Sequence, residues 1–90
     1  MFSTIEVLGT TTSSSGINIA VGDHRLFYLS NEYTGTFFSK ELLNAKPNKK
    51  ICAQFVGTGA TVYCSVEYID ANTIKLASDG THSVSLYSLD

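Results

Sequence analysis

Residues 61–82 decide the fold of this chain, and they read TVYCSVEYIDANTIKLASDGTH. Apolar and polar side chains alternate on both sides of Asp70-Ala71-Asn72, which is the period-two pattern of strands with one buried face. Asp, Asn and Gly are also the residues that short turns need. The stretch therefore predicts a strand, a tight turn, a second strand and, after Asp79-Gly80-Thr81, the start of a third.

The alternation extends to both sides of this stretch and predicts a strand register. The expected opposing pairs are Phe55 with Val62, Ala53 with Cys64, Ile51 with Val66, Tyr68 with Ile74, Val66 with Leu76, Leu76 with Val84, and Ile74 with Leu86. A slip of one residue at any turn would move these side chains into water, so the register is strongly specified. We therefore predict a C-terminal four-stranded meander with one apolar face.

The rest of the chain adds further short strands and almost no helical periodicity. The predicted strands are Phe2–Leu8, Ile17–Val21, His24–Leu29, Tyr33–Phe38, Lys50–Val56, Thr61–Ile69, Thr73–Ala77 and His82–Leu89. Only residues 39–46 suit a short helix, with Ser39 as its N-cap and Pro47 ending it. The predicted fold class is all-β: one domain over residues 1–90, a small antiparallel β-sandwich or barrel of about eight short strands.

The N-terminal half must cover the apolar face of the meander. Ile17, Ile19 and Val21 suit this role, with Phe37 or Phe38. A further pair of residues should cover this face, and two alternatives remain open for it: Phe27 with Leu29, or Leu26 with Tyr28. The Ser/Thr-rich residues 10–16 are either a plain connector or an arm that contacts a neighbour.

Composition excludes several classes of function. The net charge is −2 and only 16% of the residues are charged, so the basic surface of a nucleic-acid-binding protein is missing. No apolar run approaches the roughly 20 residues that span a membrane, and the chain starts without the pattern of a signal peptide. We expect synthesis in a cytoplasm, with neither nucleic acid nor membrane as partner.

The two cysteines allow a disulfide or two free thiols. A hairpin centred on Thr58 would place Cys52 opposite Cys64, whereas the hydrophobic register turns Cys64 inward and Cys52 outward. The second arrangement is favoured, because a slip would expose three or four apolar side chains at roughly 1.5–3 kcal/mol each. We predict free thiols. With His24 and His82 the cysteines fit no zinc-ligand spacing, so no metal is expected.

Catalysis also lacks a motif. Asp23 and His24 are adjacent, and adjacent strand residues point to opposite faces. His82 is expected at the shoulder of a hairpin, and the glycines form no phosphate-binding loop. We predict that the protein is not an enzyme and has no cofactor.

The aromatic residues outnumber what one inner face of a 90-residue domain can hold, so some should face a partner. Serine and threonine make up 21 residues, which gives a hydroxyl-rich surface that is easy to desolvate. A chain this small has a thin margin of stability, which favours oligomerisation. The candidate interface residues are Phe2, Tyr33, Phe37, Phe38, Lys49 and Lys50.

The segment Asp70-Ala71-Asn72-Thr73-Ile74-Lys75-Leu76-Ala77, followed by Gly80-Thr81-His82, resembles a segment of structural proteins from tailed-phage virions. In those proteins a longer Ala- and Asn-rich insertion follows the second strand, and here it is shortened to Ser78-Asp79. The resemblance covers about a quarter of the chain and carries no catalytic residue. It implies a non-enzymatic virion protein, a capsid decoration or cement protein that contacts the major capsid protein or tail components and forms a homo-oligomer. The alternative is a tail or fibre module that binds a host receptor or glycan.

Overall fold

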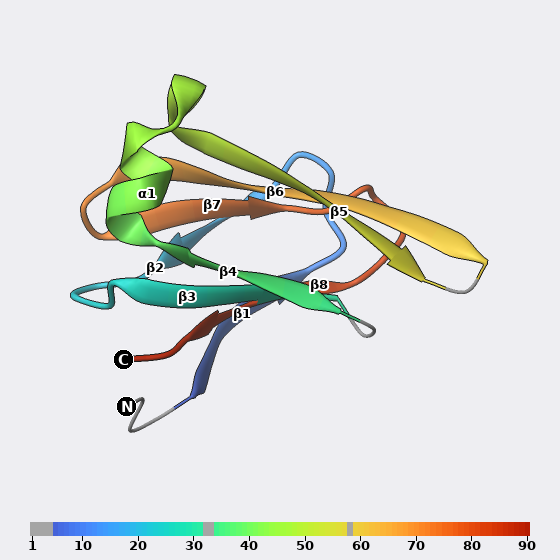
Figure 1. The fold of residues 1–90 in the computed structure, drawn as a ribbon, viewed down its shortest axis with the longest axis horizontal. Coiled ribbons are helices and arrows are strands. Elements are labelled where there is room, and N and C mark those ends of the chain that lie inside the picture. The colour runs from blue at the N-terminus through green and yellow to red at the C-terminus, as the bar shows by residue number, and fades with distance from the viewer. Residues whose placement is uncertain (1–4, 32–33, 58) are drawn as a thin grey trace.

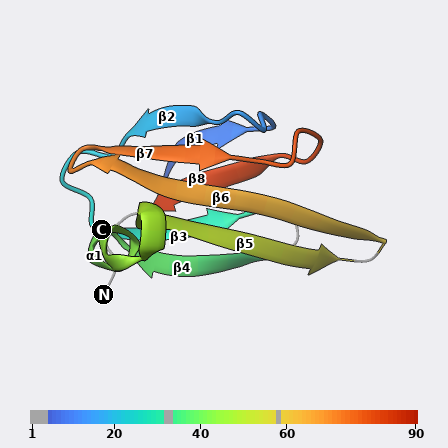
Figure 2. The same ribbon diagram turned by 90° about the horizontal axis from the view of Figure 1, so that it is seen from above.

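The computed structural model describes residues 5–31, 34–57 and 59–90 and shows two four-stranded antiparallel sheets packed face to face (Figures 1 and 2). Sheet A has the strand order β1-β8-β3-β4 and sheet B the order β2-β7-β6-β5. The strands are β1 (Glu6–Thr11), β2 (Ile17–Ala20), β3 (Leu26–Ser30), β4 (Gly35–Ser39), β5 (Lys50–Gly57), β6 (Ala60–Asp70), β7 (Thr73–Ala77) and β8 (Val84–Ser88). The predicted all-β class with eight strands is confirmed, and the architecture is the sandwich.

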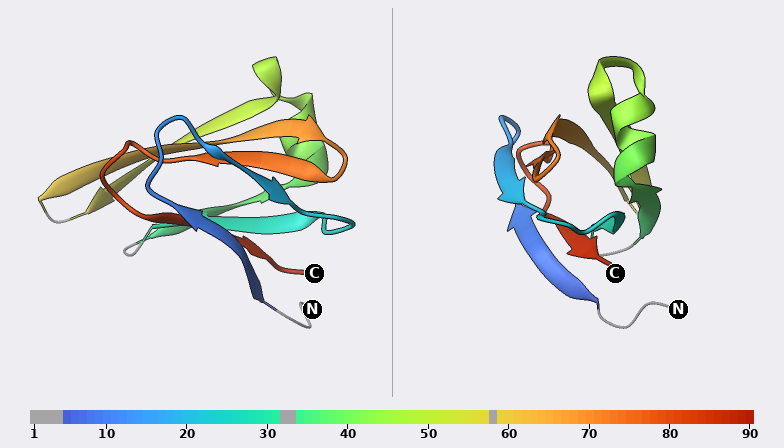
Figure 3. Two further views of the ribbon diagram at one scale, coloured as in Figure 1. Left: turned by 180° about the vertical axis from the view of Figure 1, so that it is seen from behind. Right: turned by 90° about the vertical axis from the view of Figure 1, so that its left-hand side faces the viewer.

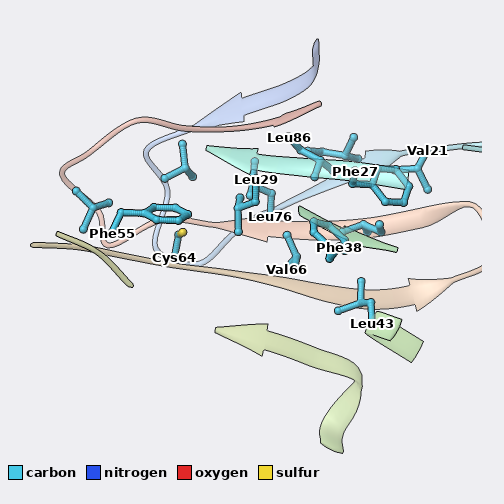
Figure 4. Close-up of a cluster of buried hydrophobic side chains, with 14 residues drawn as sticks. Val21, Phe27, Leu29, Phe38, Leu43, Phe55, Cys64, Val66, Leu76 and Leu86 are labelled. Atoms are coloured by element: carbon cyan, nitrogen blue, oxygen red, sulfur yellow. The ribbon is translucent and has the colours of Figure 1, made fainter. Parts of the chain in front are cut away.

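Alternate residues of both sheets build the core between the two layers (Figure 4). Sheet A contributes Phe27, Leu29, Phe38, Val84 and Leu86, and sheet B contributes Ile19, Phe55, Val62, Cys64, Val66, Ile74 and Leu76. The rings of Phe27 and Phe38 stack with centroids 5.3 Å apart. Of the two sets left open, Phe27 with Leu29 therefore faces the core.

The predicted register holds through β5, β6 and β7. The observed pairs include Phe55 with Val62, Ala53 with Cys64, Ile51 with Val66, Tyr68 with Ile74, and Val66 with Leu76. Cys64 is buried, Cys52 is exposed, and both thiols are free, as predicted.

The predicted place of the fourth strand of the meander is wrong. β8 does not pair with β7 but lies in sheet A between β1 and β3, and β2 occupies the free edge of β7 through the pairs Ile17 with Leu76 and Ile19 with Ile74. Val84 and Leu86 are fully buried as expected, but they reach the core from the opposite layer. Alternation identifies the inner side of a strand, but it does not show to which of the two sheets the strand belongs.

The connection from β7 to β8 explains this path. The Asp79 carboxylate accepts the backbone N–H groups of His82 and Thr81, each at 2.9 Å, and lies 2.8 Å from His82 Nδ1. The backbone N–H of His82, followed by that of Thr81, holds the pKa of Asp79 well below its usual range. Gly80 has φ +93°. These bonds shape residues 78–83 as a crossing from sheet B to sheet A, where a tight hairpin was expected.

The connection from β1 to β2 crosses between the sheets beside it. Ser13 Oγ accepts the N–H of Gly16 at 3.1 Å, and Thr11 Oγ1 accepts the N–H of Ser13 at 2.9 Å. The Ser78 N–H donates to the Ser13 carbonyl at 2.8 Å, which ties the two crossings together. These bonds hold the Ser/Thr-rich stretch against the connection from β7 to β8.

One short helix closes the sandwich between β4 and β5 (Figure 3). Helix α1 (Lys40–Ala45) starts as predicted, because the Ser39 side chain accepts the N–H of Leu42 at 3.0 Å. It inserts Leu43 into the core and is followed by the 3-10 helix η1 (Pro47–Lys49). Among the described residues, neither helix has the length and apolarity to cross a membrane.

Candidate functional site

A row of large apolar side chains crosses the outer face of sheet A. The strand register places Val7 opposite Tyr87, Tyr87 opposite Tyr28, and Tyr28 opposite Phe37. All four strands contribute one member, so the row is continuous from one edge of the sheet to the other. We call it the aromatic row.

The members of the row contact one another as cross-strand pairs do. The rings of Tyr28 and Phe37 have centroids 4.6 Å apart with their planes tilted by 46°, and those of Tyr28 and Tyr87 are 6.2 Å apart. Tilted aromatic pairs at this spacing attract one another. A Cβ atom on Gly35 would lie 2.5 Å from Cζ of Tyr28, so the glycine makes room for the Tyr28 ring. The row is thus held in position by the strands before any partner binds.

The aromatic row is exposed at both ends. Phe37 at the β4 edge is 67% exposed and Val7 at the β1 edge is 55% exposed. Two shallow hollows adjoin it, of about 270 and 390 Å³, and Phe37 and Leu89 line both. Ile5, 68% exposed, and Leu26 extend the apolar surface on one side of the row. On the other side Thr10 and Ser85 are joined through their hydroxyls at 2.9 Å.

Charges are almost absent from this face. Glu6 is the one charged residue in the four strands of sheet A. An ion pair marks the border, where the Arg25 guanidinium donates to Glu41 Oε1 with Nε at 2.6 Å. A backbone N–H at the start of α1 and the Arg25 side chain lower the pKa of Glu41. A partner could cover the aromatic row with little desolvation of ions.

The outer face of sheet B has a different chemistry. Lys50, Glu67 and Lys75 form a cross-strand row of alternating charge on β5, β6 and β7. Tyr63 stands beside this row and is 57% exposed. These side chains line a hollow of about 350 Å³ together with serines, including Ser14 and Ser65. This face suits solvent or a polar ligand.

The candidate interface residues do not form one surface. Phe37 lies in the aromatic row, whereas Lys50 lies on the outer face of sheet B and Lys49 places its ammonium 5.4 Å from the Tyr68 ring centroid. The prediction that Phe38 contacts a partner is corrected. Its side chain is only 5% exposed, because adjacent strand residues alternate and Phe37 takes the outer side. Phe2 and Tyr33 lie outside the described residues.

Sequence reasoning missed most of the aromatic row. Tyr28 and Tyr87 each alternate with buried neighbours, which was the available signal. Val7 lacks this signal, because Glu6 is exposed and Leu8 is only partly buried. Their proximity depends on the insertion of β8 between β1 and β3. With β8 placed beside β7, Tyr87 and Tyr28 would have belonged to different sheets.

The polar clusters of the described residues have structural roles. His24 Nδ1 lies 2.9 Å from the Asp90 carbonyl oxygen, and the Asp90 carboxylate accepts the N–H groups of Arg25 and Leu26. These bonds fix the start of β3 to the end of the chain. No group of three or more metal-ligating side chains lies together in the described parts of the chain.

No family model, curated protein or solved structure matches this chain. The functional argument therefore depends on the two outer faces of the sandwich.

Proposed function

We propose that this protein is a non-enzymatic structural protein of a tailed-phage virion, most simply a capsid decoration or cement protein, that docks on its protein partner through the aromatic row. The observation that carries the docking mode is the continuous, nearly uncharged row on the outer face of sheet A. The virion setting is supported by the resemblance of residues 70–77 and 80–82 to virion proteins.

The shape of this face favours a protein partner over a small molecule. Ligand pockets are concave, and they enclose the ligand with a few polar groups placed around it. The hollows beside the aromatic row are shallow, and side chains such as Phe37 and Val7 project from the surface. Tyr and Phe on a flat uncharged surface are typical of the centre of a protein interface.

The size of the face favours repeated attachment. A standard interface uses about 20–30 residues on each side, and the outer face of a four-stranded sheet with strands of five or six residues offers fewer. One contact of this size is weak. Many contacts on a repetitive shell are strong together, because each further attachment takes place at high effective concentration. This is the property that a shell-stabilising protein needs.

The polar hollow on sheet B supports the alternative function, a tail or fibre module that binds a receptor or glycan. It combines one exposed ring, Tyr63, with the carboxylate and ammonium groups of Glu67, Lys50 and Lys75. Such groups can hydrogen-bond sugar hydroxyls while the ring covers a sugar face. In that function Tyr63 and not Phe37 would be the main contact.

The experiment compares these two exposed aromatic residues. Particles of the phage that encodes the chain are purified, searched for the protein by mass spectrometry, and mixed with purified variants after the native copy has been removed. Phe37→Ser should weaken binding to particles about 30-fold, the effect of a hot-spot residue of about 2 kcal/mol, and Tyr63→Ser should leave it unchanged. Absence of the protein from particles would overturn the virion assignment. A loss with Tyr63→Ser alone would favour the alternative.

A further inference from the structure

Strand β5 is the longest edge strand of the described structure, and a helix, α1, contacts it only near its Lys50 end (Figure 2). It stands at the end of the order β2-β7-β6-β5 and hydrogen-bonds on one side only. Its eight residues, Lys50–Gly57, pair with β6 in an unbroken register. An edge of this kind presents a row of free backbone N–H and C=O groups to any extended chain that approaches it.

The other three edges are protected in ways that proteins commonly use. β1 has a register shift between Val7 and Gly9, and its Gly9 lies against Ile19 of β2. β2 itself has only four residues, Ile17–Ala20. β4 has five residues and leads directly into α1.

The side chains of β5 add no protection. From Ile51 to Gly57 there is no charged residue, no proline and no bulge. Cys52, Gln54 and Val56 are exposed on the outer side, and Val56 is 68% exposed. The β5–β6 hairpin also extends beyond the rest of the sandwich (Figure 1). The Gly57 end of β5 is therefore accessible to a second molecule (Figure 1).

We propose that β5 pairs antiparallel with β5 of a second copy, so that two copies of sheet B join into one continuous eight-stranded sheet. The pairing is isologous, which is the commonest symmetry of homodimers. It does not depend on the function proposed above, and that function does not depend on it.

Two observations favour a second copy as the occupant. First, α1 and η1 stand at the Lys50 end of the edge (Figure 2), and an antiparallel pair places the helices of one copy and those of the other at opposite ends of the paired segment. Second, the alternation of β5 is self-complementary. The inner residues Ile51, Ala53 and Phe55 would meet the same set, and the two Lys50 ammonium groups would lie far apart.

Native molar mass over a range of concentrations tests the pairing, with two lysine variants as a matched pair. Gln54→Lys places a charge on the outer side of the β5 edge, and Asn18→Lys places one on the exposed outer side of β2, the opposite edge of the same sheet. We expect a wild-type dimer of twice the 9.7 kDa chain mass, a dissociation constant raised about tenfold or more by Gln54→Lys, and no change with Asn18→Lys. Thermal unfolding confirms that both variants are folded.

Cross-linking then tests the geometry. Native Cys52 and the variants Gln54→Cys and Val56→Cys, these two in a Cys52→Ser background, are oxidised and compared with Asn18→Cys in the same Cys52→Ser background, so that each protein has one exposed cysteine besides the buried Cys64. We expect a covalent dimer from at least one β5 position and none from position 18. A wild-type monomer at every soluble concentration would overturn the proposal. So would an oligomer that Gln54→Lys leaves intact or that cross-links through position 18. Phe37→Ser should leave this dimer unchanged. A failure of the β5 pairing can therefore be distinguished from a failure of docking to particles.

Discussion

Sheet A and sheet B contribute the same kind of side chain to the core and turn different chemistry outward. Both inner faces consist mainly of large apolar side chains at alternate positions. Outside, sheet A has the aromatic row with Phe37 at its edge, whereas sheet B has the charged row Lys50, Glu67 and Lys75. An antiparallel sheet that is buried on one side needs only a polar outer face, and that of sheet B is mostly polar, with Tyr63 and Val56 among its exposed exceptions.

The comparison shows that the aromatic row is not a requirement of folding. A sandwich of this size folds with a charged outer face on one layer, so the apolar outer face of the other layer needs a separate explanation. Exposed apolar patches on small proteins commonly mark contact surfaces. The two faces should therefore differ in their response to substitution, and the two inner faces should not.

The largest expected effect tests whether the inner faces are equivalent. Leu86 of sheet A and Leu76 of sheet B are both fully buried. Replacing either by Ala should lower the free energy of unfolding by about 2–5 kcal/mol, because each change removes buried methyl groups and leaves a cavity. Urea unfolding measures both. If one substitution costs less than about 1 kcal/mol, that sheet does not share in the core as described.

The next effect separates the two outer faces. Tyr28 lies at the centre of the aromatic row and contacts both Phe37 and Tyr87, whereas Tyr63 is 57% exposed on sheet B. We expect Tyr28→Ala to cost about 1–3 kcal/mol and Tyr63→Ala less than about 1 kcal/mol. A double-mutant cycle of Tyr28 with Phe37 should give a coupling of about 0.5–1.5 kcal/mol. Zero coupling would mean that the row has no order of its own.

The sequence predicted sheet B better than sheet A, and turn length is the reason. β5, β6 and β7 are joined by very short turns, so each strand pairs with its neighbour along the chain and hydrophobic alternation sets the register. Phe55 opposite Val62 could therefore be predicted. In sheet A, β8 pairs with β1 and β3, which are far away in the sequence. Alternation contains no information about such pairs.

The same limit explains what was missed in the candidate site. Phe37 could be named because two adjacent aromatic residues in a strand must face opposite ways, although the choice between Phe37 and Phe38 required the fold. Tyr28 and Tyr87 become neighbours only after β8 is placed beside β3. A surface that is assembled by long-range pairing is not visible in local sequence patterns.

A smaller effect concerns the connection that carries the chain from one sheet to the other. The backbone N–H of His82, then that of Thr81, and the His82 side chain lower the pKa of Asp79. A lowered carboxyl pKa adds stability above the unfolded value of about 3.9, and this contribution is lost as the pH falls below that value. Asp79→Asn should therefore lower the Tm at pH 7 and differ less from wild type at pH 3. An equal difference in Tm between wild type and Asp79→Asn at both pH values would show that ionisation of Asp79 does not contribute to stability.

The smallest effect on stability concerns the two sides of sheet B. Cys52 is exposed on its outer side, while Cys64 is buried on its inner side, and burial raises the pKa of the Cys64 thiol to about 11. The thiolate is the reactive form, so a maleimide at pH 7.5 should modify Cys52 first. Cys64 should react only through transient unfolding, at a rate that rises with added urea. Intact mass spectrometry follows both additions, and Cys52→Ser isolates the slow one. Equal rates in native buffer would mean that the inner side of sheet B is open to solvent. The description of β6 as a strand with one buried and one exposed face would then be wrong.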